Sequence, residues 1–146
     1  MRTTIVVIVA VLGLIGSSSV GTAQEKSEKK GTKWQGPIVC SSNQGTGEFW
    51  IILYDDSTFK SKWTVNCYGE TILSFLAKGA YNLVGTNLSF DSSGTAKSDM
   101  GSSSRYTVKV SGKLLETTGS GNYKIEFWND DWPPEESGTW EVEKVK

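Results

Sequence analysis

Residues 49–65, FWIILYDDSTFKSKWTV, contain the pattern that decides the fold. Phe49 to Tyr54 is an apolar run, and Phe59 to Val65 alternates large apolar side chains with lysine and threonine. Alternation with a period of two residues is typical of a β-strand that has one buried face and one solvated face. The intervening Asp55-Asp56-Ser57 has the composition of a tight turn. This stretch therefore predicts a β-hairpin.

Similar segments lie on both sides of the hairpin and are separated by glycine-rich or serine-rich joins. The segment 71–77 is apolar enough for a short helix, but its strand-like neighbours favour a strand. The predicted strands are 34–41, 49–54, 59–65, 71–77, 80–84, 87–91, 105–110, 113–117, 123–128 and 138–145, and further tight joins are predicted at 85–86, 92–94, 111–112 and 119–121. Sequential strands with short joins predict an all-β antiparallel meander, closed into a barrel of about eight to ten strands, with a β-sandwich as the alternative.

The N-terminus has the three parts of a secretory signal peptide. Arg2 precedes the uncharged apolar run Ile5–Ile15, and small residues lead to a predicted cleavage site after Ala23. The run of about 11 residues is too short to span a bilayer, which takes about 20, so we expect no transmembrane anchor. Residues 1–23 are thus predicted as a signal peptide, 24–33 as a flexible lysine-rich tail and 34–146 as the barrel domain.

Cys40 and Cys67 are the only cysteines. A signal peptide directs the chain to a secreted or periplasmic location, where a cysteine pair normally forms a disulfide. The sequence therefore predicts a Cys40–Cys67 bridge, and two free thiols are the alternative.

Composition excludes several classes of function. The chain has no histidine, which removes the commonest general base and most zinc and copper sites. Acidic residues outnumber basic ones from Trp34 onward, which argues against a nucleic-acid partner. No glycine-rich loop precedes a helix, so we expect no phosphate-bound cofactor. No other motif assigns a cofactor, a catalytic residue or a metal site, and we expect none. We expect the domain to be a monomer.

Carboxylates gather in a proline-containing connection near the C-terminus. Asp130, Asp131, Glu135 and Glu136 lie there, close to Trp128 and Trp132. Paired acids beside tryptophans are typical of a glycosidase site, and oxygen-rich loops bind calcium. Solvated loop acids are the commoner explanation and the one favoured here.

The six tryptophans fall into two groups. Trp34, Trp63 and Trp140 alternate with small or apolar residues and are predicted to lie in the core. The other three are candidate ligand contacts, with packing inside the protein as the alternative: Trp50 on a strand that is apolar on both faces, and Trp128 and Trp132 in the proline connection.

The glycine-punctuated meander and its last strand, Gly138-Thr139-Trp140, resemble small exported lipocalin-like barrels of the calycin type. In lipocalins the Gly-x-Trp motif lies on the first strand, whereas here the first strand offers Gly31-Thr32-Lys33-Trp34. The resemblance implies an apolar ligand in the barrel mouth, and it assigns no binding residue.

Three functions follow from these observations. The leading hypothesis is an exported, non-enzymatic binding module for a small apolar molecule or a protein partner. A carbohydrate-binding module that uses Trp128 and Trp132 is the second. A carboxylate hydrolase built on residues 130–136 is the third.

Overall fold

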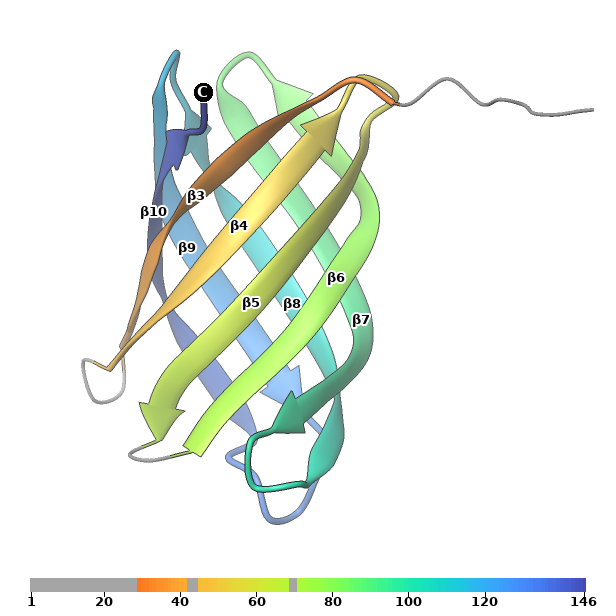
Figure 1. Ribbon diagram of the computed structural model, residues 1–146, viewed down its shortest axis with the longest axis vertical. Coiled ribbons are helices and arrows are strands. Elements are labelled where there is room, and N and C mark those ends of the chain that lie inside the picture. The colour runs from red at the N-terminus through yellow and green to blue at the C-terminus, as the bar shows by residue number, and fades with distance from the viewer. Residues whose placement is uncertain (1–28, 42–44, 69–70) are drawn as a thin grey trace, which may run out of the picture.

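The computed structural model describes residues 29–41, 45–68 and 71–146, which form one closed antiparallel β-barrel (Figure 1). Each strand pairs with its neighbours in sequence, and the last strand closes the barrel on the first. The strands are β3 (Gly31–Cys40), β4 (Thr46–Tyr54), β5 (Thr58–Tyr68), β6 (Thr71–Val84), β7 (Asn87–Ser98), β8 (Ser103–Leu114), β9 (Thr118–Phe127) and β10 (Glu135–Lys144). The predicted all-β barrel is confirmed, and the alternative β-sandwich is wrong because closure through β10 and β3 leaves no sheet edge.

The predicted signal peptide, 1–23, and residues 24–28 of the predicted tail lie outside the described residues. The rest of the tail runs into the barrel, because β3 begins at Gly31 rather than at Trp34. Gly31, Thr32 and Lys33 pair with the end of β4. Backbone hydrogen bonds to β4 order these residues despite their polar composition.

Several predicted turns are wrong because the strands are longer than their glycine spacing suggested. Predicted strands 71–77 and 80–84 form the single strand β6, and the predicted joins at 92–94, 111–112 and 119–121 lie inside β7, β8 and β9. The predicted strand 113–117 is also wrong, since β8 ends at Leu114. The turn at Gly85, which has a φ of 63°, and the turn after Tyr54 are confirmed.

Glycine inside these strands makes room for aromatic rings instead of turning the chain. Gly112 on β8 lies opposite Gly121 on β9, and a Cβ atom at either position would collide with the indole of Trp140. A Cβ atom at Gly94 would approach the ring of Tyr106 to 3.2 Å. The turns predicted at 92–94, 111–112 and 119–121 are wrong because the sequence does not distinguish a glycine that makes room for a ring from a glycine that turns the chain.

Side chains complete the barrel wall where the β6–β7 ladder is interrupted. Ser74 pairs with Lys97, and pairing resumes only at Tyr81 with Phe90. The Tyr106 hydroxyl donates to the carbonyl of Leu76 (3.0 Å), and the Ser92 hydroxyl donates to the carbonyl of Lys78 (2.9 Å). These bonds satisfy carbonyls that the ladder leaves open.

Aromatic side chains fill the barrel interior. Trp63 is fully buried at the centre, where it stacks on Phe49 (4.5 Å between ring centroids) and on Phe75 (5.8 Å). Trp34 and Trp140 are also buried, so the three predicted core tryptophans are confirmed. An eight-stranded barrel is just wide enough for side chains to fill its interior, and here large rings occupy it.

Candidate functional site

The three tryptophans predicted to contact a ligand lie in three different environments. Trp50 is half-buried on the outer face of β4, and Trp128 is 55 % exposed beside the guanidinium of Arg105. Trp132 is buried: it packs against Phe127 with ring centroids 5.1 Å apart, and its indole nitrogen donates to Ser102 Oγ (3.0 Å). Trp128 and Trp132 therefore do not form a shared exposed surface.

The carboxylates of the proline connection point to different places. Asp130 and Asp131 are exposed and line a mainly polar hollow beside Trp128. Glu135 lies on the outer wall, 3.7 Å from the ammonium of Lys124. Glu136, the next residue, faces the barrel interior and is buried. Adjacent residues of a strand point to opposite faces, which separates the acids that the sequence placed together.

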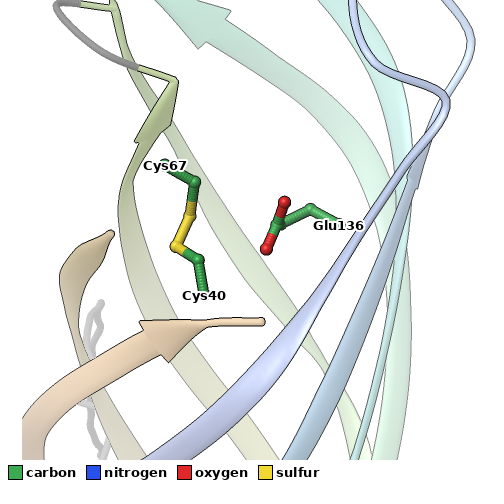
Figure 2. Close-up of side chains that lie close together, drawn as sticks. All are labelled: Cys40, Cys67 and Glu136. Atoms are coloured by element: carbon green, nitrogen blue, oxygen red, sulfur yellow. A yellow bond between two sulfur atoms is a disulfide. The ribbon is translucent and has the colours of Figure 1, made fainter. Parts of the chain in front are cut away.

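The predicted disulfide between Cys40 on β3 and Cys67 on β5 is present. Figure 2 shows the carboxylate of Glu136 pointing toward this bridge from β10. One potential ligand atom from each of the three buried residues lies within 4.8 Å of the others. In the bridged form neither sulfur is a thiolate, the state in which cysteine binds metals. Burial, and secondarily the charge of Glu136, raise the pKa of the nearby Tyr123 hydroxyl.

The outer face of β3–β6 carries an arrangement that the sequence alone did not assemble. Two rows of side chains cross the strands in register: Gln35, Trp50, Lys62 and Leu76 form one row, and Lys33, Ile52, Lys60 and Lys78 form the next. Figure 1 shows β3, β4, β5 and β6 side by side along this wall. We call this surface the lysine face and define it as Lys29, Lys33, Lys60, Lys62 and Lys78 with Trp50, Ile52, Tyr54 and Leu76.

Two lysines of this face lie over aromatic rings. The Lys33 ammonium is 5.2 Å from the ring centroid of Trp50, and the Lys29 ammonium is 5.2 Å from that of Tyr54. Attraction between a cation and a ring face restrains each ammonium close to the sheet. Each half-buried ring of the pair therefore has a positive charge beside its face.

One end of the lysine face is hollowed into a groove of about 800 Å³. Its lining is Lys29, Tyr54, Thr58, Phe59, Lys60, Lys78 and Gly79. Gly79 has a φ of 155° and presents no side chain to the groove. A mainly apolar lining that includes three lysines suits a ligand that has both a ring and a negative charge.

Lys29 is the one groove lysine with a carboxylate neighbour in the described part of the chain. Its ammonium is 3.2 Å from Asp56 Oδ2 and donates to Thr58 Oγ1 at 3.2 Å. The Thr58 hydroxyl donates to Asp56 Oδ1 (2.5 Å). This hydroxyl and then Lys29 hold the pKa of Asp56 below its ordinary value.

Lys60 and Lys78 lie directly opposite each other on β5 and β6. Among the described residues, no carboxylate oxygen lies within 4.0 Å of either ammonium. Like charges in directly opposite positions of an antiparallel pair are destabilising. The groove thus contains an uncompensated repulsion.

A second lysine pair elsewhere on the barrel shows how the chain compensates such a repulsion. Lys109 on β8 lies directly opposite Lys124 on β9. Lys109 also faces Asp91 on β7, and the Lys124 ammonium is 3.8 Å from Glu126 and 3.7 Å from Glu135. The Lys124 ammonium thus has two carboxylates within 4.0 Å and Lys109 has an acidic residue in the opposite position on β7, whereas neither lysine of the groove pair has a described carboxylate within 4.0 Å.

No protein-family model, curated protein or solved structure matches the chain. The site is therefore interpreted from its own geometry. The described residues include no helix with the length and apolarity needed to cross a bilayer. The disulfide is compatible with an extracellular location, and the closed eight-stranded barrel is compatible with a lipocalin-like architecture.

Sequence reasoning found part of this site. The alternation of 59–65 placed Lys60 and Lys62 on one face, and the two-sided apolar strand 49–54 singled out Trp50. It assigned Lys29 and Lys33 to a tail and did not include Lys78. The signal that it lacked was strand register, because register brings these residues together from separate segments.

Proposed function

We propose that this protein is an exported, non-enzymatic, lipocalin-like binding module that binds its partner on the lysine face. Its signal peptide would direct it to a secreted or periplasmic location. The observation that carries the proposal is the directly opposed, uncompensated Lys60–Lys78 pair in a groove beside an aromatic ring. Proteins break local stability rules mainly at functional sites.

The filled interior supports an external site over a ligand in the barrel lumen. Trp63, Tyr106 and Trp140 are among the largest side chains that are fully buried, and they occupy the space in which a lumen ligand would lie. The burial of Trp132 removes half of the indole pair that a loop carbohydrate site would use. The divergent acids of 130–136 likewise give no support to a carboxylate hydrolase.

The test is a thermal-shift screen of the exported chain, with its disulfide intact, against fatty acids, phospholipid vesicles, neutral and acidic glycans, and calcium. A ligand at 100 times its dissociation constant adds about 2.7 kcal/mol to stability. We expect at least one class to raise the melting temperature. That shift should be lost in the Lys60→Gln/Lys78→Gln variant and kept in the Lys109→Gln/Lys124→Gln variant.

The two variants remove the same charge from the protein, so net charge cannot explain a difference between them. Equal loss of the shift in both variants would contradict a site on the lysine face. A ligand that binds both variants as tightly as the wild type would place binding elsewhere, and no shift with any class would also contradict the proposal.

A further inference from the structure

We infer that the partner of the lysine face is an acidic polysaccharide, a chain of sugar rings bearing sulfate or carboxylate groups. This inference rests on the proposed function and specifies its ligand.

Charge and ring alternate at short range on this face. Trp50 lies directly opposite Lys62, and Tyr54 lines the same groove as Lys60 and Lys78. Strands are about 4.8 Å apart, so each ring has an ammonium within about the width of one sugar. Sugar rings pack against indole and phenol side chains, and ammonium groups bind sulfate and carboxylate oxygens.

The lysines without ion pairs favour an anionic partner with more than one charge. Lys33, Lys60, Lys62 and Lys78 come from three strands of the lysine face, β3, β5 and β6, and no described carboxylate lies within 4.0 Å of their ammonium groups. A single small anion would neutralise one pair at most. A polymer that carries charges along its length would offset all four lysines and remove the Lys60–Lys78 repulsion.

The depth of the apolar side chains favours a polysaccharide over a lipid bilayer. Peripheral proteins anchor in membranes by burying apolar surface about 5–10 Å into the headgroup boundary. Here Trp50 and Tyr54 are half-buried, each with a lysine ammonium 5.2 Å from its ring centroid, and Leu76, 63 % exposed, is the one strongly exposed aliphatic side chain of the lysine face. The outer wall of a closed barrel is also convex, so a flat bilayer would contact it along a narrow strip (Figure 1). A flexible polymer can follow the wall into the groove.

The experiment measures binding of the exported chain by calorimetry at low and at physiological salt. The probes are a heparin oligosaccharide for sulfate, polygalacturonate for carboxylate and dextran as the uncharged control. Vesicles containing phosphatidylglycerol and a short DNA duplex represent the other anionic partners. We expect at least one acidic polysaccharide to bind more tightly than dextran, the vesicles and the duplex, with an affinity that falls as salt rises.

The variants locate the binding site. Replacing two contacting lysines in Lys60→Gln/Lys78→Gln should weaken polysaccharide binding roughly 10- to 30-fold. Lys109→Gln/Lys124→Gln should bind within about twofold of the wild type. Both pairs are exposed, and the circular dichroism spectrum checks that each variant keeps the barrel.

The remaining outcomes distinguish failure of the polysaccharide inference from failure of the proposed function. Binding of vesicles or DNA that depends on the lysine face, at least as tight as that of the polysaccharides, overturns the inference and leaves the proposed function standing. Polysaccharide binding that both double variants weaken equally overturns the inference as well. If no probe binds through Lys60 and Lys78, and the wider screen also finds no such ligand, both the inference and the proposed function fail.

Discussion

Reversing the charge of Lys78 should stabilise the free protein. Lys78 faces Lys60 across the β5–β6 pair, with no described carboxylate within 4.0 Å of either ammonium. The Lys78→Glu variant replaces a repulsion with an attraction. Directly opposed charged pairs contribute about 0.2–1 kcal/mol with either sign, so we expect the free energy of unfolding to rise by about 1 kcal/mol. For a domain of this size that is a gain of about 3–5 °C in melting temperature.

Urea and thermal unfolding at low salt and at about 1 M salt would measure this gain. Salt at 1 M reduces the screening length to about 3 Å, so the advantage of the variant should shrink there. Lys124→Glu is the matched control, because it also replaces a cross-strand lysine pair, that with Lys109, but it breaks the ion pairs to Glu126 and Glu135 and adds a third acid beside them. That control should be less stable than the wild type. A Lys78→Glu variant that is no more stable at low salt, or whose gain is the same at high salt, would refute the reasoning.

Three further predictions concern the barrel itself. Gly112→Ala places a Cβ atom against the Ser120 carbonyl oxygen and the indole of Trp140, so the free energy of unfolding in urea should fall by about 1–3 kcal/mol; an unchanged midpoint would contradict this close approach of β8, β9 and the ring. Replacing Cys40 and Cys67 together by alanine should cost about 3–4 kcal/mol in the same assay, because the bridge spans 27 residues of sequence; a loss below about 1 kcal/mol would show that it adds little. Burial raises the pKa of Tyr123 above the unfolded value of about 10, so its contribution to stability is complete below that pH and is lost as pH rises further. Tyr123→Phe should flatten the fall in melting temperature above about pH 10, and an unchanged pH profile would count against this cause.

Residue patterning predicted the fold class because the alternation of apolar and polar side chains is a local property. Phe59–Val65 shows it most plainly: its odd-numbered residues are buried, Trp63 completely, whereas Lys60 and Lys62 are exposed. The cysteine pair was equally predictable, since an exported chain with two cysteines normally bridges them. Strand ends were less predictable, because glycine marks both a turn and a close approach of a ring. Gly112 and Gly121 belong to the second kind.

The candidate site was predictable only in part. The sequence identified Trp50 as a ligand candidate because its strand is apolar on both faces. The alternation of residues 59–65 also placed Lys60 and Lys62 on the same face of their strand. It could not show that Trp132 turns inward while Trp128 stays exposed. That outcome depends on how the connection packs against Phe127.

The amino-acid sequence by itself determined that this chain forms hairpins, buries alternate aromatic side chains and has a pair of cysteines to bridge. Local pattern and composition are enough for those results, because each depends on neighbours a few residues apart. Only the tertiary structure decided which lysines lie close together on the barrel surface. Lys33, Lys60 and Lys78 come from three strands, and the register of the closed barrel sets them in one row. Register is fixed by the burial of the opposite face, so the inward packing of rings such as Trp63 positions the charges on the outside.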